Sequence, residues 1–468
     1  MAHILTVTSG LPSIRYPTVE LARRLAAAGH RLTCASIPDD RGLVEHQGLA
    51  FLPLDPSGYE QFLDTDARAG ALHRLLTLRH RREQARDSMA AGSFVGIVRD
   101  LAPDLLLVNG EMHEHIIAVS ATGVPMALLN VFVSIWRQPG LPPPHHPVRP
   151  GVGWLGTRAG TALLWQALRA RKRGRACAQY VRRIGCDYLS VLKQLARDTA
   201  FDFRRETDDS QWLIPFTYRR LPVLSLHAVE FEFPHRPPER VHYVGPMVLE
   251  SRTDRPQTAA DRAELGVVFA RCRRAGGGRT LVYAGFGSAF STDRAFLQRL
   301  LGAVAARPDW DLVVSLGGRL APGDLGPVPE NVHAFAWVPQ LDVLKHADVA
   351  VTHGGINTID ECVLNGVPAL VYCGSETDMA GTTARVVHHG IGIAGDRRRD
   401  ETADIRAHID RLLRDPRFGQ NVRRLQRCYA TYAEQRVAER AVASLLERGM
   451  ATGTADRGRA TARGGAIS

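Results

Sequence analysis

The chain has 468 residues, 45% of them hydrophobic, which is long enough for two domains that each bury a core. The formal net charge is +11, and nearly all of the positive charge is arginine because the chain has only three lysines. Arginine is spread along the whole chain, which argues against a dedicated nucleic-acid-binding domain. Seven irregularly spaced cysteines argue against a disulfide framework, and no CxxC pair suggests a zinc site.

The amino-terminal residues MAHILTVTSG contain no basic segment followed by a long apolar core, so we expect no signal peptide. We also expect no transmembrane helix, because no run of about 18 apolar residues occurs. These features are typical of a cytoplasmic enzyme.

Predicted strands and helices alternate in the first part of the chain. HILTVTSG is expected to be a buried strand and turn, YPTVELARRLAAAGH a helix that ends at Gly29, and RLTCAS a second strand. Residues 104–111 and 125–132 are expected to be further strands with a helix between them. This alternation predicts a parallel sheet covered on both faces.

Residues 138–235 interrupt the alternation. The segment QPGLPPPHHPVRPG is too rich in proline for regular structure. The next segment, WLGTRAGTALLWQALRARKRGR, runs from apolar residues into a basic cluster. Such a segment can make peripheral contact with a membrane surface, but a lid or packing helix of a binding pocket is the favoured interpretation.

The second half resumes the alternation after a predicted linker, HYVGPMVLESRTDRPQTAADR. Six further strands are expected in TLVYAGFGS, DLVVSLGG, VHAFAWVP, VAVTHGG, PALVYCG and GIGIAG. The sequence therefore predicts two doubly wound α/β domains, residues 1–245 and 246–430, that face each other across a cleft. A helix over 431–448 would close the fold, and the tail 449–468 is expected to be disordered.

The stretch VTHGGINTIDECVLNGVPALVYC predicts an anion site. Its first strand leads into His353-Gly354-Gly355, and a helix starts directly afterwards. Glycine allows a ligand to approach the backbone, and a helix N-terminus offers free N–H groups and partial positive charge. Glu361 follows one turn later, where it could accept hydrogen bonds from a pair of ribose hydroxyls. Two glycines at a strand–helix junction also fit a simple packing turn.

The wider segment FAWVPQLDVLKHADVAVTHGGINTIDECVLNGVPALVYCGSETDM resembles the nucleotide-sugar signature of family 1 glycosyltransferases, the UDP-glycosyltransferase-like group. The matching residues keep the family's order: Trp337, Pro339, Gln340, His353, Gly355, Asn357, Thr358, Glu361, Gly366, Pro368 and Asp378. THGGINT followed by ARVVHHGIG is most similar to the zeaxanthin and macrolide glycosyltransferase branches. The similarity is dense from Thr280 to about Leu413 and looser over residues 1–135.

The resemblance implies a GT-B fold and inverting sugar transfer from a nucleotide donor, with no metal and no cofactor. The N-terminal domain would bind the acceptor and the C-terminal domain the donor. Trp337 would stack on the base beside Gln340, with Val338 in the same donor site. The other donor-binding residues implied are Gly287 and Ser288 at the sugar-proximal phosphate, His353, Gly355, Asn357 and Thr358 at the pyrophosphate, Glu361 at the ribose, and Asp378 and Met379 at the sugar.

The usual catalytic dyad of the family is missing. A histidine normally follows the first strand and takes the acceptor's proton, while an aspartate after a later strand orients it. Aligned on Pro17, the chain has Ile14 at the histidine position and Asn109 at the aspartate position.

Three interpretations remain open. A substitute base could come from NGEMHEH, where Glu111 and His113 are the candidates and His115 lies near them. Alternatively, an acidic acceptor could attack with little help from a base, because positioning and leaving-group stabilisation supply much of the acceleration. The third interpretation is an inactive homologue that binds a nucleotide sugar or helps a partner enzyme.

The donor and acceptor can be narrowed by residue chemistry. Met379 stands where the family usually has glutamine, and its thioether cannot donate hydrogen bonds to sugar hydroxyls. A deoxysugar has fewer hydroxyls that need a hydrogen-bond partner. The sequence therefore favours a UDP or dTDP donor that carries a deoxysugar. The expected acceptor is a small hydrophobic natural product.

Overall fold

The computed structural model describes residues 1–468 except 56–57, 69, 90, 253–256, 273–277, 288–292, 375–376 and 449–468. Two predictions lie outside the described residues, namely the phosphate contact of Ser288 and the disordered tail 449–468.

Seven parallel strands form the first sheet, in the order β3-β2-β1-β4-β5-β8-β9. Their bounds are β1 His3–Val7, β2 Arg31–Ser36, β3 Ala50–Pro53, β4 Leu105–Asn109, β5 Met126–Asn130, β8 Val223–Ser225 and β9 Val241–Tyr243. Strand β1 lies between β2 and β4, so the strand order reverses there. Ligands of doubly wound sheets bind beyond the carboxyl ends of strands at such a reversal.

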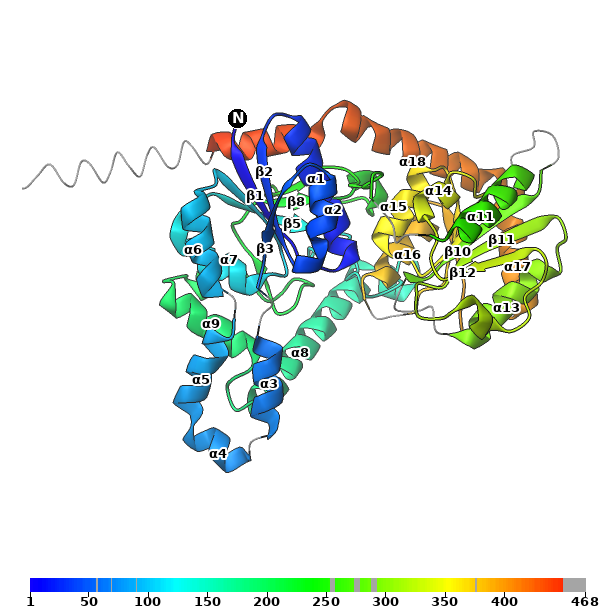
Figure 1. The fold of residues 1–468 in the computed structure, drawn as a ribbon. Coiled ribbons are helices and arrows are strands. Elements are labelled where there is room, and N and C mark those ends of the chain that lie inside the picture. The colour runs from blue at the N-terminus through cyan, green and yellow to red at the C-terminus, as the bar shows by residue number, and fades with distance from the viewer. Residues whose placement is uncertain are drawn as a thin grey trace, which may run out of the picture.

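Six parallel strands form the second sheet, in the order β12-β11-β10-β13-β14-β15. Their bounds are β10 Thr280–Gly285, β11 Trp310–Ser315, β12 Val332–Phe335, β13 Val349–Thr352, β14 Ala369–Val371 and β15 Gly392–Ala394. The order reverses between β10 and β13. The two sheets confirm the prediction of two doubly wound α/β domains, which form the two lobes in Figure 1.

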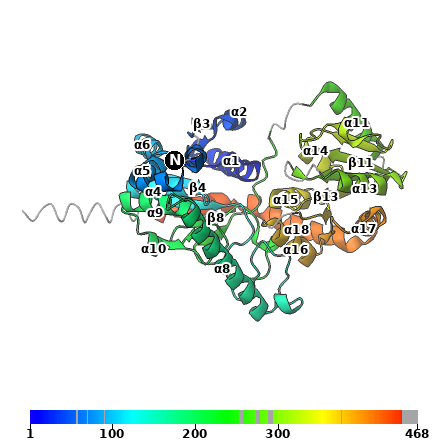
Figure 2. The same cartoon turned by 90° about the horizontal axis from the view of Figure 1, so that it is seen from below.

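The helices of the first lobe include a group inserted between β3 and β4 and a second group between β5 and β8. Their bounds are α1 Pro12–Ala27, α2 Arg41–His46, α3 Tyr59–Arg68, α4 Ala71–Leu76, α5 Leu78–Asp87, α6 Ala91–Leu101, α7 His113–Val119, α8 Arg158–Arg182, α9 Tyr188–Asp198 and α10 Phe203–Glu206. A short antiparallel ribbon, β6 Thr207–Asp208 and β7 Thr217–Tyr218, follows α10. Helix α8 slants from the first lobe toward the gap between the lobes, as Figure 2 shows.

The helices of the second lobe cover both faces of its sheet. Their bounds are α11 Ala259–Cys272, α13 Arg294–Ala305, α14 Gln340–Leu344, α15 Ile356–Leu364, α16 Met379–His388, α17 Thr402–Arg414 and α18 Pro416–Glu434. Helix α18 starts at Pro416, which suits a first helical position because its missing N–H needs no partner there.

The closing helix differs from its predicted span of 431–448. Helix α18 already begins at Pro416 and ends at Glu434. Arg436, two residues later, has a φ of 50° and interrupts the helical conformation. A second helical stretch, residues 437–448, then returns to the first lobe (Figure 1). Its Val442 and Leu445 are buried in the same cluster as Ile4 and Leu32 of the first sheet. Residues 437–448 therefore complete the part of the core that contains Ile4 and Leu32.

Alternating side chains of β1 fill two separate layers of the first lobe. Leu5 and Val7 pack with Ile116 of α7 on one face, whereas Ile4 packs with Leu21 of α1 on the other. Burial on both faces explains why β1, β4 and β5 read as continuous apolar runs.

Candidate functional site

The segment between β13 and α15 has the conformation that an anion site requires. Gly354 has a φ of +86°, and a Cβ there would lie 2.8 Å from Cγ1 of Val371. Gly355 is the residue before the first turn of α15, and a Cβ there would lie 2.9 Å from Nε2 of His353. Both glycines are needed for steric reasons, and together they present the start of α15 beside the His353 imidazole.

His353 lies against a second glycine segment. Gly287, after β10, has a φ of +61°, and a Cβ there would lie 3.2 Å from Cε1 of His353. Burial lowers the pKa of His353 to about 4, although a hydrogen bond with the Gly285 backbone opposes the change. The imidazole is therefore neutral near pH 7, and a bound diphosphate would favour its protonation.

The first turn of α15 connects this turn to the other lobe. Asn357 Nδ2 donates a 2.9 Å hydrogen bond to the carbonyl oxygen of Ser13, near the start of α1. Thr358 lies in the same turn and is partly buried. The carboxyl ends of β1 and β13 thus lie close together across the cleft.

Glu361 is buried on α15 and is held by groups from three segments. Arg252, in the segment between the lobes, donates to Oε1 of Glu361 at 2.6 Å. Gln340 donates to Oε2 of Glu361, while the hydroxyl of Tyr283 donates to Oε1 of Gln340 at 2.8 Å. The sequence analysis missed Arg252 and Tyr283, because no local pattern links them to Glu361.

Trp337 and Val338, which are predicted to lie at the nucleobase of the donor, have different surroundings. Trp337 is partly exposed, and its carbonyl oxygen accepts a 3.4 Å hydrogen bond from Nε2 of Gln257. The Val338 side chain is buried in the cluster that contains Phe335 and Leu265. Any contact of Val338 with a ligand would therefore come from its backbone.

Asp378 and Met379 stand at the start of α16. Asp378 directly precedes the helix, and Met379 is its first residue. Burial raises the pKa of Asp378 to about 6. A carboxyl group with this pKa is mainly ionised at pH 7, where it accepts hydrogen bonds, and it can also donate one as pH falls toward 6.

Glu111 lies in the cleft between the lobes, at the end of β4. Its side chain is exposed to solvent, but the surrounding protein walls partly desolvate it and raise its pKa, to which the Asp378 carboxylate adds. The backbone N–H of Glu111 donates a 3.0 Å hydrogen bond to Oδ1 of Asn109. Asn109 thus fixes the turn that presents Glu111, and Ile14 is buried in the apolar core of the first lobe.

His113 and His115 are directed into the protein rather than into the cleft. His113 is buried against Phe216, and its Nδ1 lies 3.1 Å from the hydroxyl of Tyr218. Burial lowers the pKa of His113 to about 4. His115 is also buried, with its ring edge-on to Phe94. The geometry therefore favours Glu111 over His113 as a base, because His113 cannot reach an acceptor in the cleft.

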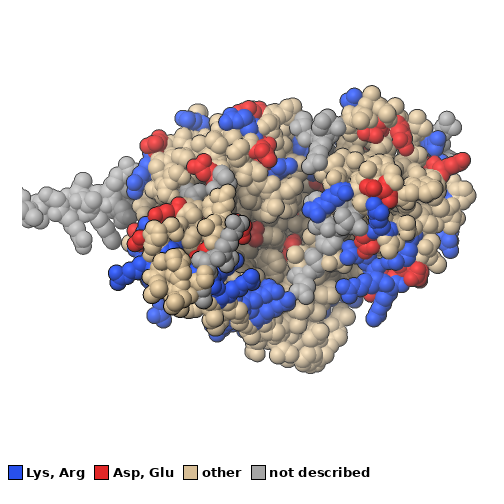
Figure 3. Space-filling model, turned by 60° about the horizontal axis from the view of Figure 1, so that its bottom comes forward, with Lys and Arg blue, Asp and Glu red and all other residues tan. Residues whose placement is uncertain are grey.

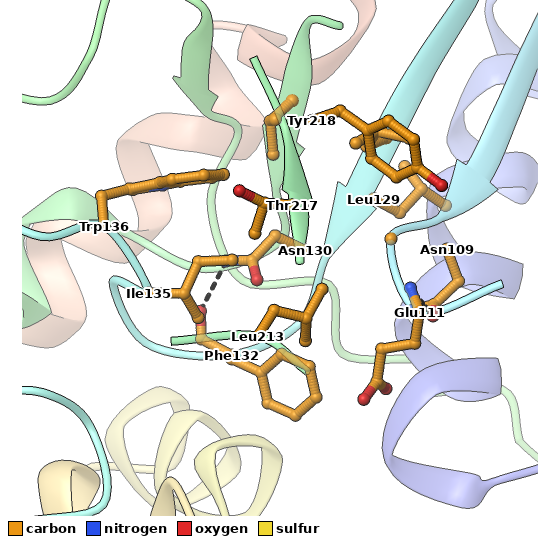
Figure 4. A pocket seen from close by; sticks show the side chains of 13 residues that line it. Asn109, Glu111, Leu129, Asn130, Phe132, Ile135, Trp136, Leu213, Thr217 and Tyr218 are labelled. Atoms are coloured by element: carbon orange, nitrogen blue, oxygen red, sulfur yellow. Dashed lines mark hydrogen bonds between the residues drawn. The ribbon is translucent and has the colours of Figure 1, made fainter. Parts of the chain in front are cut away.

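A narrow cavity of about 20 Å³, here called the inner cavity, opens beside Glu111. Figure 4 shows the Glu111 carboxylate at one end, near Leu213 and Phe132, with Trp136 at the other end. The lining is mainly apolar, and its polar members include Asn109, Asn130, Thr217 and Tyr218. An apolar pocket beside a carboxylate suits a hydrophobic molecule that is held by one polar end.

The described residues contain neither a candidate membrane-spanning helix nor a candidate metal-binding cluster. None of the helices within the described ranges is long and apolar enough to cross a membrane. No cluster of three or more His, Cys, Asp or Glu side chains that could hold a metal occurs in the described part of the chain.

Comparison with known proteins places this arrangement among glycosyltransferases. Residues 298–443 match the family model of the erythromycin biosynthesis protein CIII-like C-terminal domain. The chain is 27% identical over 440 residues to the oleandomycin glycosyltransferase of Streptomyces antibioticus, covering 91% of this chain and 86% of that protein. It is 23% identical to the zeaxanthin glucosyltransferase of Pantoea ananas, over 97% of both chains.

Solved structures share the whole fold. The glycosyltransferase of kitacinnamycin superposes with a TM-score of 0.66 at 22% identity, covering 96% of this chain and 98% of that one. The glycosyltransferase VinC, solved in complex with dTDP, superposes with a TM-score of 0.59 at 20% identity, covering 94% of this chain and 100% of that one. These matches confirm the predicted GT-B fold and the predicted resemblance.

Proposed function

The chain is a glycosyltransferase of the GT-B fold, and from this premise we propose that it transfers a sugar, with inversion, from a UDP or dTDP donor to a small hydrophobic natural product. The observation that carries the proposal is the glycine-flanked His353 at the start of α15, with the carboxylate of Glu361 further along the same helix.

On the donor side, the N-terminus of α15 would hold the pyrophosphate. Departure of a nucleoside diphosphate develops negative charge, which free N–H groups and a histidine stabilise without a metal ion. Protonation of His353 would strengthen this effect as the charge develops. Glu361 would receive the ribose hydroxyls, either in place of or beside Arg252 and Gln340.

On the acceptor side, the apolar body of the acceptor would lie against the mouth of the inner cavity. Its hydroxyl or other nucleophile would then lie near Glu111, whose raised pKa suits a general base. Asp378, across the cleft, would hold the donor sugar. Inversion would require the acceptor nucleophile beside Glu111 to attack the anomeric carbon on the side opposite the leaving diphosphate.

Met379 supports a donor with fewer hydroxyls. A buried polar group that loses its partner is costly, so a site with a thioether at this position suits a deoxysugar. Two structural relatives were solved with thymidine diphosphate, which supports a dTDP carrier.

A second candidate is an inactive homologue that binds a nucleotide sugar. The observation that favours it is the replacement of the usual dyad by the buried Ile14 and by Asn109. The two candidates share the donor site and differ only in turnover.

Competition binding of UDP, dTDP and their sugars tests both candidates, with His353→Ala as the variant that should lose affinity. Donor hydrolysis and transfer to a broad acceptor panel are followed in the same samples. Nucleotide binding with turnover supports the transferase, whereas binding without turnover supports the inactive homologue. Absence of nucleotide binding would contradict both.

A further inference from the structure

Helix α8 presents two basic faces with different surroundings. Arg169 and Arg173, one turn apart, both pair with Asp209, at 3.5 and 3.3 Å. Arg171, Lys172 and Arg175 lie on the other face, here called the basic face of α8, and line a cavity. Asp209 therefore pairs with the outer face of α8, which is the face that carries Arg169 and Arg173.

The cavity along the basic face, here called the outer cavity, has a volume of about 170 Å³. Leu168 precedes the three cations, so positions 168, 171, 172 and 175 follow the spacing of one helix face. Glu111 also lines this cavity, as it does the inner cavity. The two cavities thus meet at the candidate base.

Lys172 is a buried cation. Its side chain is largely removed from solvent, and Nζ donates to the carbonyl oxygens of Gln211 and Leu213, at 2.9 and 2.6 Å. No described carboxylate lies within ion-pair distance of it. Burial lowers its pKa to about 8, although the more distant charges of Asp209 and Asp208 oppose the change. Burying an ammonium group without a directly paired counter-ion is costly, so this position is suited to a negative charge supplied from outside.

Two ring side chains, Trp212 and His145, also line the outer cavity. Nε1 of Trp212 donates to Nδ1 of His145 at 3.2 Å. The Trp212 ring also packs edge-to-face on Phe132 of the inner cavity, with a centroid separation of 5.4 Å. A flat apolar molecule could lie on these rings while its polar end meets the cations. Figure 3 shows the hollow between the lobes with Lys and Arg side chains gathered along part of its edge.

We propose that the acceptor carries an anionic group, a carboxylate by class, which binds the basic face of α8 while the nucleophile of the acceptor lies at Glu111. The inference rests on the proposed function and deepens it by naming the charge of the substrate. Guanidinium groups bind carboxylates through paired, charge-assisted hydrogen bonds, which makes arginine a selective residue for this role. Glu111 is the only acid among the described residues that line the outer cavity, so the cations there outnumber the acids.

A matched pair of fluorescent probes tests the proposal. 7-Hydroxycoumarin-3-carboxylic acid and its ethyl ester share the aromatic ring and the hydroxyl, and differ in the anionic group. Binding is measured by fluorescence titration of the full chain at low salt. The wild type is expected to bind the acid about tenfold more tightly than the ester, and 0.5 M NaCl is expected to reduce this preference.

The double variant Arg171→Gln/Arg175→Gln is expected to lose the preference and to bind the two coumarins about equally. Arg173→Gln is the matched control, because it removes the same charge from the same helix on the face that pairs with Asp209. This control is expected to keep the preference.

Equal binding of the two coumarins by the wild type, binding of neither, or an unchanged preference in the double variant overturns the proposal. Binding of dTDP and UDP is measured on the same samples to separate the two levels of inference. Loss of nucleotide binding in the wild type would contradict the proposed function. Intact nucleotide binding without an anion preference would contradict only the charge assigned to the acceptor.

Discussion

Glu111 and His353, two side chains of the cleft, have pKa values shifted in opposite directions. The carboxyl of Glu111 has a raised pKa because of desolvation and the nearby Asp378, and the Asn109 side chain holds its backbone. His353 has the opposite shift, because burial disfavours its charged form. An ordinary pKa at Glu111 would make its carboxylate a weaker base, and an ordinary pKa at His353 would leave part of the imidazole population charged before the leaving group forms.

Substitution of Glu111 by glutamine is expected to lower kcat by roughly 10²-fold, since the amide cannot take the acceptor's proton. The wild-type rate should fall as pH drops through the raised pKa of Glu111, and the variant should lose this dependence. Steady-state rates from pH 5 to 9 provide the measurement, with the Kd for dTDP as the control for folding. An unchanged rate would exclude Glu111 as the base.

Nucleotide binding is expected to be coupled to protonation of His353. Its pKa is about 4 in the free protein and should be higher beside a diphosphate, so binding takes up protons. Between these two pKa values, affinity contributed by His353 increases as pH falls. Calorimetric titration of dTDP from pH 5 to 8 measures this increase. His353→Gln reports the titration of the nucleotide itself, and equal pH slopes in both proteins would contradict the coupling.

At the scale of elements, the proline-rich segment of the first lobe touches the helix that carries Asp378. The N–H of Gly381, in α16, donates a 2.6 Å hydrogen bond to the carbonyl oxygen of Pro144. A Cβ at Gly381 would lie 2.4 Å from that oxygen, and the backbone cannot easily move away. The contact fixes the N-terminal end of α16, where Asp378 and Met379 stand, against the segment whose His145 lines the outer cavity.

Gly381→Ala is therefore expected to push α16 from the proline-rich segment and to reduce kcat by about tenfold or more, because small misplacements are costly in catalysis. The Kd for dTDP reports any accompanying displacement of the turn before α15, because Gly354 lies beside Met379 and Thr383 of α16. Gly266→Ala in α11 is the control, as a Cβ there meets nothing within 4 Å. Equal activity of the two alanine variants would show that the contact has no catalytic role.

The elements were largely predictable from the sequence, whereas their contacts were not. β2 matches RLTCAS, and the unit from β13 through α15 follows the predicted order, because apolar runs and glycines mark these elements locally. The basic segment lies in α8 and lines a cavity, and its role as a helix of the acceptor pocket stays a prediction. The pairing of Arg252 with Glu361 spans 109 residues, and no local pattern reports such a contact.

At the scale of the whole molecule, a buried ionic network joins the two lobes. Glu232 of the first lobe accepts from Nε of Arg385, in α16, at 2.7 Å and also from His227 and the N–H of Ser134. Burial alone would raise the pKa of Glu232, but the Arg385 charge and the His227 hydrogen bond lower it to about 2. This lowered pKa means that the network stabilises the fold above the unfolded pKa of Glu232 and weakens as pH falls toward 2.

Arg385→Met is expected to lower the free energy of unfolding by ~3–5 kcal/mol, because the Glu232 carboxylate remains buried without its main counter-ion. Arg385→Met/Glu232→Gln should recover part of this loss. Urea denaturation measures both, with Arg41→Met as the control, because the Arg41–Glu45 pair is solvent-exposed and its loss should cost less than ~1 kcal/mol. A loss as small as that of the control would contradict the importance of the network.

The return of residues 437–448 to the first lobe has a consequence for folding during synthesis. Val442 and Leu445 fill the same layer as Ile4 and Leu32, although more than 400 residues separate Leu32 from Val442 in the sequence. Domains generally fold one after another as the chain leaves the ribosome. Here part of the apolar layer of the first domain stays uncovered until the second has been made, because residues 437–448 follow the second domain in the chain and pack on the first.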